Sequence, residues 1–406
     1  MKKTLFPLLA LSLALAACLP PPRPGLRPAG PSVTLVPPAQ WPPLRDDLDA
    51  DSLARAAERT LAYLKALAPK LTEFGDRKVG PQLMRETAEE LVRLRREART
   101  PEELAAGLRE RFDLYRVSGA TTAAGGAFFS AYYQPVLKAS PVRTERFAFP
   151  LYRKPADLLE ADLGAFGSKW KGEGVVGRVE GGRFVPYFDR GDIDVRRRLE
   201  GRKLELAWLE NAFDRVDLHV QGSGLLEFPD GKMVVARYAA TNGLPYRSVG
   251  VAVVGSGAMR REEIDRERLR RYLAEHPEGE AWLLAQNPRY AFFELADAPA
   301  DGEPFGQIGQ PLTAGRSAAV DPKTVPLGLP AFIRLPMAQV DAEGRLLGKA
   351  DASRFVFCQD VGSAITGPGR VDLYVGHGLS AMETAVRVWD AGELYILLKK
   401  LPARDR

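Results

Sequence analysis

The feature that most constrains the fold is a change of sequence pattern near residue 125 of the 406-residue chain. Beyond it, short apolar or alternating runs are separated by glycine and proline, as in segments 127–140, 172–188, 215–239 and 247–255. Runs of this kind, bounded by turn residues, are typical of β-strands. After Pro311 the pattern returns in the runs AAVDP, PAFIRLP, RFVFCQD, RVDLYVG and ELYILL. We therefore expect a mainly β protein.

Helical spacing marks two other regions. Between residues 51 and 112, apolar residues recur at the spacing of one helix face in successive stretches. Ser52 is placed to cap the first helix, and the sequence TPEE at 100–103 supplies a cap, a proline at the first helical position and a capping-box glutamate. A further helical region is expected at 260–286, where one face carries Leu269, Tyr272 and Leu273.

The N-terminal sequence MKKTLFPLLALSLALAAC has the pattern of a secretory signal: two lysines, an apolar run, and small residues before a cysteine. The apolar run is too short for a permanent membrane span. Its end, Leu15-Ala16-Ala17-Cys18, resembles the bacterial lipobox, which implies cleavage before Cys18 and acylation of that residue. Acyl chains contribute about 0.8 kcal/mol per buried CH₂, so several chains anchor a protein firmly. A plain cleaved signal, with Cys18 incidental, is the alternative.

Residues 19–45 are rich in proline and lack periodicity, which predicts a semi-rigid tether of roughly 3.1 Å per residue where polyproline II forms. The chain has one other cysteine, Cys358, which has no disulfide partner if Cys18 is acylated. Its apolar surroundings predict a small buried hydrophobe in a strand.

Charge and motifs exclude several classes of function. The formal net charge of +5 is small for this length, and a solvated surface of mixed charge explains it without a nucleic-acid partner. No GxSxG, Walker A or HExxH motif occurs, and the three histidines are too scattered to predict a metal cluster. We expect a monomer with no cofactor and no metal.

A carboxylate-based site on β scaffolding remains. In FCQDVGSAITGPGRVDLYVGHG (357–378), Asp360 and Asp372 stand twelve positions apart between short apolar runs. Cleavage of a glycosidic bond needs a proton donor, usually a carboxylic acid of raised pKa. Residues of the kinds that bind sugars occur elsewhere in the β region: Tyr132, Tyr133, Gln221, Ser223, Asn242, Tyr246 and Arg247. Many binding modules share this composition, so composition alone leaves catalysis open.

Five blocks in a fixed order carry a resemblance to a known family. They are SAYYQP (130–135), VQGSGLLEFPDG (220–231), YAATNGLPYRSVG (238–250), AAVDPKTVPLGLPAFI (318–333) and the segment 357–378. On these blocks the chain, from about residue 125 to 400, resembles the membrane-bound lytic murein transglycosylase A family. Two positions depart from the family pattern. Ser130 stands where threonine is frequent, and Leu244 stands where histidine is common.

The resemblance implies a fold with a double-psi β-barrel domain, an inserted smaller β-barrel-like domain, and a long groove between them. The expected organisation is a lipoprotein signal at 1–18, a tether at 19–45, a helical region with the start of the barrel domain at 46–138, an inserted β domain at 139–245, and the rest of the barrel domain, with a three-aspartate region, at 246–406.

By the same resemblance, Asp372 matches the catalytic aspartate, and Asp360 and Asp321 match the neighbouring acidic positions of the three-aspartate region. Turn capping is the alternative role for Asp321 and Asp360, which precede a proline and a glycine bend. The resemblance places the QGSG and TNGLPYRS blocks along the groove. The expected substrate contacts are Ser130, Tyr132, Tyr133, Gln221, Ser223, Asn242, Tyr246 and Arg247.

The implied activity is exo-type lytic cleavage of peptidoglycan strands at the β-1,4 bond between N-acetylmuramic acid and N-acetylglucosamine, with formation of 1,6-anhydromuramic acid ends. Asp372 would act as acid and then as base, which requires an apolar setting that raises its pKa. The alternative is a non-catalytic, peptidoglycan-binding lipoprotein. A lipid anchor predicts a location in the cell envelope, at the outer membrane and facing the periplasm.

Overall fold

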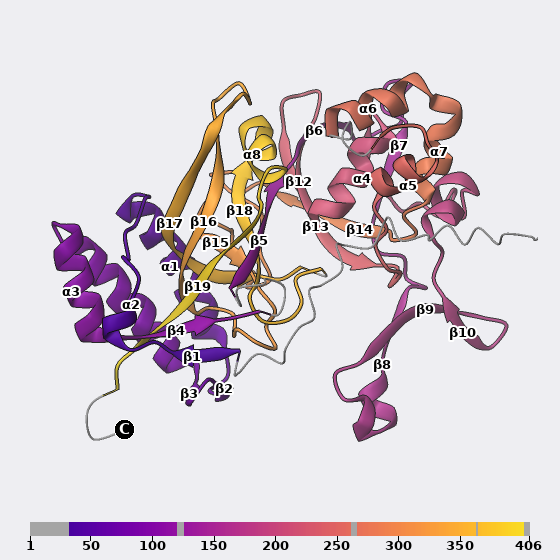
Figure 1. Cartoon of the computed structure of the whole chain (residues 1–406). Helices are drawn as coiled ribbons and strands as arrows, with labels where there is room; N and C mark the ends of the chain where they lie inside the picture. Colours follow the sequence, from indigo (N-terminus) through magenta and orange to yellow (C-terminus); the bar gives the residue numbers. More distant parts are fainter. Residues whose placement is uncertain (1–31, 120–125, 261–265, 363, 402–406) are drawn as a thin grey trace, which may run out of the picture.

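The computed structural model describes residues 32–119, 126–260, 266–362 and 364–401. Figure 1 shows N-terminal helices, a β-barrel beside them, and a second sheet that carries its own helices. The fold is mixed α/β and mainly β, as the sequence predicts. Cys18 and the N-terminal part of the tether lie outside the described residues. Among the helices of the described ranges, none combines the length and the apolar character needed to cross a bilayer.

Six strands form a closed ring. They pair in the order β19–β16–β17–β15–β18–β5, and β5 pairs again with β19. Two more strands, β1 (Val33–Leu35) and β4 (Phe112–Val117), extend the sheet from β19. Buried apolar side chains fill the interior of the ring. The ring strands are β5 (Ala127–Gln134), β15 (Ser317–Ala319), β16 (Pro330–Val340), β17 (Leu346–Asp360), β18 (Arg370–His377) and β19 (Trp389–Lys399).

A second sheet lies between β5 and β15 in the chain. Its order is β14–β13–β12–β6–β11–β7. Arg153, just after β7, bridges to Phe293 of β14, which brings two edges of the sheet together. The expected end of the inserted domain, residue 245, lies between β13 and β14, which pair with each other. The strands are β6 (Val136–Ser140), β7 (Phe149–Tyr152), β11 (Glu205–Leu209), β12 (Ser223–Glu227), β13 (Met233–Thr241) and β14 (Ala291–Asp297).

Four helices pack beside the second sheet: α4 (Ala212–Gln221), α5 (Val249–Gly255), α6 (Arg266–Glu275) and α7 (Pro277–Ala285). The last two confirm the helical region expected at 260–286.

The strand predictions at 215–221 and 247–255 are wrong. The first segment forms most of α4, which Asn211 caps by accepting a hydrogen bond from the Asp214 N–H at 2.7 Å. The second forms α5, which Ser248 caps. Val249 and Val253, one helical turn apart, are buried between these helices. Short apolar runs fit a strand or a helix equally well, and here the cap and the packing decide.

The second sheet and helices α4 to α7 together form what we call the second unit. A three-stranded sheet, β10–β9–β8, projects from this second unit in Figure 1. It contains β8 (Leu159–Asp162), β9 (Gly174–Glu180) and β10 (Arg183–Pro186). Gly181 and Gly182 turn the β9–β10 hairpin with φ of 56° and 75°, values that glycine adopts without strain. The remaining elements are η1 (Pro38–Gln40), β2 (Thr72–Phe74), β3 (Arg77–Val79), η2 (Leu163–Phe166), η3 (Ser168–Trp170), η4 (Gly191–Val195) and α8 (Gly378–Ala385).

The N-terminal helices α1 (Ala50–Ala66), α2 (Pro81–Glu97) and α3 (Pro101–Arg111) cover one side of the barrel. They bury leucine side chains against Phe332 and Phe355 of β16 and β17. Thr100 caps α3, as predicted. The cap of α1 is Asp49 rather than Ser52, because the helix begins at Ala50 and the Asp49 carboxylate accepts a hydrogen bond from the Ser52 N–H at 2.7 Å.

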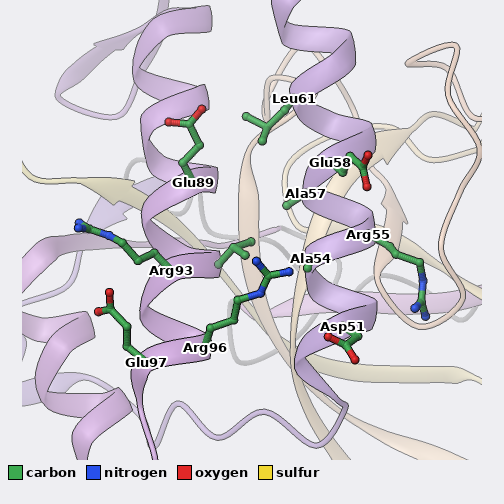
Figure 2. Close-up of a pocket in the computed structure, with 11 residues that line it drawn as sticks. Asp51, Ala54, Arg55, Ala57, Glu58, Leu61, Glu89, Arg93, Arg96 and Glu97 are labelled. Atoms are coloured by element: carbon green, nitrogen blue, oxygen red, sulfur yellow. The ribbon is translucent and has the colours of Figure 1, made fainter.

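A cavity of about 750 Å³ lies between α1 and α2 (Figure 2). Small and apolar side chains of α1, such as Ala57 and Leu61, line it together with charged side chains of both helices, including Arg55, Glu89 and Arg96. None of the site residues predicted from the sequence lines this cavity.

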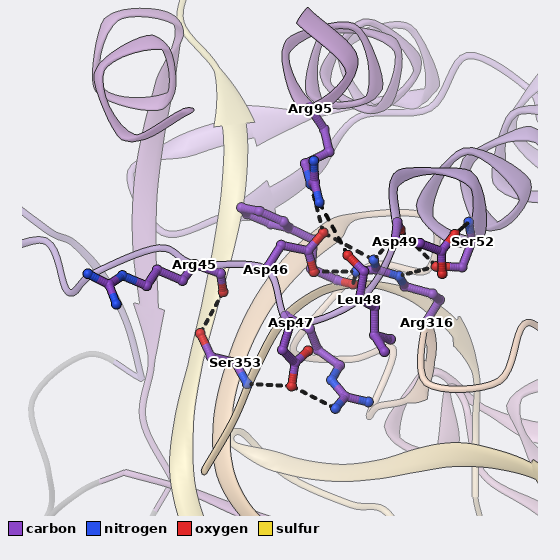
Figure 3. Close-up of polar contacts among 11 residues, drawn as sticks. Arg45, Asp46, Asp47, Leu48, Asp49, Ser52, Arg95, Arg316 and Ser353 are labelled. Carbon is purple, nitrogen blue, oxygen red and sulfur yellow. Dashed lines mark hydrogen bonds and ion pairs between the residues drawn. The ribbon is translucent and has the colours of Figure 1, made fainter. Parts of the chain in front are cut away.

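A buried ion pair ties the N-terminal segment to the barrel (Figure 3). Arg316 donates from Nη1 and Nη2 to the two carboxylate oxygens of Asp46, at 2.7 and 3.0 Å. The side chains of Arg316 and Asp46 are 0% and 1% exposed. Arg316 also donates to the Ser52 hydroxyl and to the carbonyls of Phe355 and Asp49. Every N–H of the guanidinium therefore has a partner.

Cys358 lies in β17 and is fully buried in the barrel interior. Burial raises the pKa of its thiol to about 12. The prediction of a small buried hydrophobe in a strand is confirmed.

Candidate active site

The centre of the candidate site is Asp372, on the outer face of the barrel. In the sheet, Asp372 of β18 is paired with Ser130 of β5 on one side and with Ala319 of β15 on the other. Its neighbours Val371 and Leu373 fill the barrel interior. Because strand side chains alternate between the two faces, Asp372 faces outward. The Ser130 hydroxyl donates a hydrogen bond to Oδ1 of Asp372.

Burial raises the pKa of Asp372 above its ordinary value. The hydrogen bond from Ser130 and the positive charge of Arg370 lower that pKa, and the charge of Asp360 raises it further, so that the net shift is upward. The carboxyl group therefore keeps its proton to a higher pH than an exposed aspartate does.

Arg370 forms a hydrogen bond with Ser130 and none with Asp372, on which it acts only through its charge. Its Nη2 donates to the Ser130 hydroxyl oxygen at 2.8 Å, and its Nη1 donates to the carbonyl of Val371 at 2.8 Å. Within the described ranges, no lysine or arginine forms an ion pair with Asp372 at 4.0 Å or less. An arginine that held this carboxyl permanently ionised would be incompatible with an acid role, and none of the arginines that the structure describes forms such a pair.

Asp360 ends β17 and lies close to Asp372 across a single strand. Ala319 of β15 is paired with Asp360 on one side and with Asp372 on the other. The Tyr132 hydroxyl donates to Oδ2 of Asp360 at 2.7 Å, and the Gln307 N–H donates to Oδ1 at 2.9 Å. Burial raises the pKa of Asp360 as well. Both of its oxygens are engaged by the protein, in contrast to Asp372, which has one such partner.

Asp321 holds backbone in place. One carboxylate oxygen accepts from the N–H of Lys323 at 2.9 Å, and the other accepts from the N–H of Gly367 at 2.6 Å. The first bond closes the turn after β15, and the second fixes the loop that leads into β18. These contacts correspond to turn capping, the alternative role that the sequence left open for Asp321.

Three further residues of this face were not among the site residues predicted from the sequence. Arg370 and Tyr374 stand two positions on either side of Asp372 in β18, so the alternation of the strand puts them on the same face; that signal was present in RVDLYVG. Tyr374 packs against Tyr132, with ring centroids 5.3 Å apart, and its hydroxyl donates to the Glu303 carboxylate. Burial raises the pKa of Glu303. Glu303 comes from the connection between β14 and β15, and no sequence pattern pointed to it.

Three other predicted residues lie where the barrel meets the second unit. Tyr133 is buried; its hydroxyl donates to Asp217 of α4 at 2.6 Å, and its N–H donates to Oε1 of Gln221 at 3.4 Å. Gln221 and Ser223 are half-buried at the end of α4 and the start of β12. These contacts join β5 to the second unit.

The TNGLPYRS block separates into buried and exposed residues. Asn242 is fully buried: its amide nitrogen donates to the carbonyls of Phe188 and Pro288, and its oxygen accepts from the N–H groups of Tyr290 and Leu244. This side chain has no polar atom left for a ligand, so the expectation of a direct glycan contact does not fit its surroundings. Tyr246 and Arg247 are exposed.

Comparisons with known proteins agree with this arrangement. Residues 128–294, which include the second sheet, match the MltA specific insert domain, and residues 316–398, which hold the barrel strands from β15 onward, match the 3D domain. A barrel with a 3D domain and an MltA insert defines an MltA-type protein. The chain belongs to the membrane-bound lytic murein transglycosylase A family.

Individual relatives support the same assignment. The membrane-bound lytic murein transglycosylase A of Escherichia coli K12 is 28% identical over 292 residues, which are 70% of this chain and 69% of the relative. The crystal structure of a membrane-bound lytic murein transglycosylase from Agrobacterium tumefaciens is 28% identical, with a TM-score of 0.71, and the match covers 91% of this chain and 98% of that one. Escherichia coli MltA with bound chitohexaose shares the fold, at 22% identity and a TM-score of 0.69, over 92% of this chain and 95% of that one.

Proposed function

We propose that this protein is a lytic transglycosylase that cleaves the β-1,4 bond between N-acetylmuramic acid and N-acetylglucosamine in peptidoglycan and leaves 1,6-anhydromuramic acid ends. The observation that carries the proposal is the outward-facing carboxyl of Asp372, which has a raised pKa, accepts one side-chain hydrogen bond, and has no ion-pair partner among the described residues. The family name and the chitohexaose bound to the Escherichia coli relative support a glycan substrate.

The chemistry needs one group that gives a proton and later takes one back. Protonated Asp372 donates its proton to the glycosidic oxygen as the bond from that oxygen to C1 of the muramic acid breaks. The C6 hydroxyl of the same sugar then forms a new bond to C1, and its proton passes to the Asp372 carboxylate. The anhydro ring closes, the enzyme returns to its protonated form, and no water is consumed.

A lone acid fits this reaction better than it fits hydrolysis. Glycoside hydrolases generally pair two carboxyl groups, one of which is a nucleophile or activates water. Asp360 is the nearest other carboxyl in the sheet, and both of its oxygens already accept hydrogen bonds. We assign Asp360 and Asp321 to shaping the site, and Ser130 to orienting Asp372.

The remaining predicted contacts fall into two groups in this proposal. Half-buried or exposed side chains are offered as glycan contacts: Tyr132, Gln221, Ser223, Tyr246 and Arg247. The buried Tyr133 and Asn242 are offered as supports that hold strands and loops for them. We further propose that the barrel is of the double-psi type, that the inserted unit ends after β14, and that acylated Cys18 anchors the protein to the outer membrane, facing the periplasm.

The masses of the products test the proposal. The purified protein is incubated with murein, and released fragments are analysed by mass spectrometry. Anhydro-ended muropeptides are the expected result. Fragments heavier by one water would identify a hydrolase, and binding without release would identify the non-catalytic glycan-binding lipoprotein.

Replacing Ser130 by alanine should move the alkaline limb of the kcat/KM profile to higher pH. The Ser130 hydrogen bond lowers the Asp372 pKa, so its loss raises that pKa and the acid form persists further up the pH scale. Ser223→Ala, which removes a hydroxyl on the other unit, should leave the limb in place. A shift to lower pH in Ser130→Ala would mean that Arg370 had reached the carboxylate, against the arrangement described above.

A further inference from the structure

An exposed tryptophan stands in the same row of the sheet as the proposed acid. Strand β5 pairs with β18 on one side and with β19 on the other, and Ser130 is the partner of both Asp372 and Trp389. Residues paired in this way project from the same face of a sheet. Trp389 therefore faces outward beside Ser130, about 10 Å from Asp372 at the usual spacing of two strands.

Trp389 is held in place although 69% of its surface is exposed. The ring of Phe128 meets the indole edge-on, with centroids 4.9 Å apart and planes at 80°. The guanidinium of Arg370 lies 5.5 Å from the indole centroid and 5.4 Å from the Phe128 centroid. Arg370 is itself fixed by its hydrogen bonds to Val371 and Ser130. Such contacts limit the rotamers of an exposed indole before any ligand arrives.

We propose that Trp389 is a stacking platform for one pyranose ring of an N-acetylhexosamine glycan, in the direction from Asp372 toward β19. The inference rests on the proposed function and adds a subsite to it. The C–H face of a sugar is apolar and packs on an aromatic ring, while its hydroxyl and acetamido oxygens accept hydrogen bonds from a cation such as Arg370. Asp372 and Trp389 are separated by about 10 Å, two strand spacings, a distance that linked sugar rings can span, so one glycan chain can reach both residues.

Binding of chitohexaose, a glycan without peptide, tests the platform. Affinities are measured by isothermal titration calorimetry in the Asp372→Asn background, so that turnover does not interfere. Trp389→Ala should weaken binding about tenfold, while Trp389→Phe, which keeps an aromatic face, should stay within about threefold. Trp282→Ala is the matched control, because Trp282 is 61% exposed on α7, in the second unit.

With Asp372 intact and murein as substrate, Trp389→Ala should raise KM and leave kcat nearly unchanged, because the platform binds substrate and transition state alike. The urea midpoints of both Trp389 variants should match the parent, since the side chain is mostly exposed. Unchanged chitohexaose binding in Trp389→Ala would overturn the platform. The platform would also be overturned if Trp389→Ala lost affinity only for peptide-bearing murein, or if both Trp389 variants lost affinity together with a lower urea midpoint.

The two proposals fail separately. If chitohexaose binding depends on Trp389 but murein yields no anhydro product, the proposed activity is refuted and the platform is supported. If Trp389→Ala releases anhydro products at an unchanged KM, the proposed activity is supported and the platform is refuted.

Discussion

Asp372→Asn is expected to lower the rate of anhydromuropeptide release about 10³-fold or more, because asparagine cannot supply the proton that the leaving oxygen needs. The amide has nearly the shape of the carboxyl group, and its oxygen can still accept the hydrogen bond from Ser130. Affinity for chitohexaose should therefore stay close to that of the parent protein. The measurement is the initial rate of product release from murein, with binding determined in parallel.

Asp351→Asn is the matched control for this variant. Asp351 is an exposed aspartate on β17, so its amide should leave the rate unchanged. Near-native release by Asp372→Asn would refute the assignment of the acid. Equal losses in the two variants would show damage to the barrel rather than removal of a catalytic group.

Asp46→Ala is expected to lower the free energy of unfolding by about 3–5 kcal/mol, because it leaves the charge of Arg316 buried without a counter-ion. The Arg316 side chain is fully buried, and the carboxylate of Asp46 satisfies two of its N–H groups. Asp46 also accepts from Arg95 of α2 at 3.1 Å, so the substitution loosens the helix layer as well. Urea denaturation followed by circular dichroism measures the change.

An exposed ion pair provides the comparison. Glu73 and Lys78 lie 3.4 Å apart with side chains 74% and 64% exposed. Solvent screens such a pair, so Glu73→Ala should change the free energy of unfolding by less than about 1 kcal/mol. A similar small change for Asp46→Ala would show that water reaches Arg316 readily and that the buried pair does not hold the N-terminal segment.

The strands were predictable from the sequence where alternation was clear. RVDLYVG became β18 and RFVFCQD became the end of β17, so two of the three predicted aspartates fall where the pattern put them. Alternation in β18 also predicts that Arg370 and Tyr374 lie on the same face as Asp372, although neither was predicted as a site residue. The helix at 247–255 could not be told from a strand, because a run such as GVAVVG fits both until its packing partners are known.

Other parts of the site depend on contacts that no local pattern records. Glu303 reaches Tyr374 from a connection 71 residues away in the chain. Asn242 carries a side-chain amide, a group that often binds sugars, yet its four hydrogen bonds are all formed with surrounding backbone groups. Residue type suggested a direct contact in this case, whereas the burial of Asn242 favours the supporting role proposed above.

Strand β5 ends at Gln134 and β6 begins at Val136, with Pro135 alone between them. The proline ring holds φ of Pro135 at about −65°, which restricts backbone rotation at this junction. On this side, the barrel and the second sheet are joined by one proline residue, and Ser130 lies in the strand that leads into it. The direction in which the second sheet leaves the barrel is therefore set next to the strand that positions the Asp372 carboxyl.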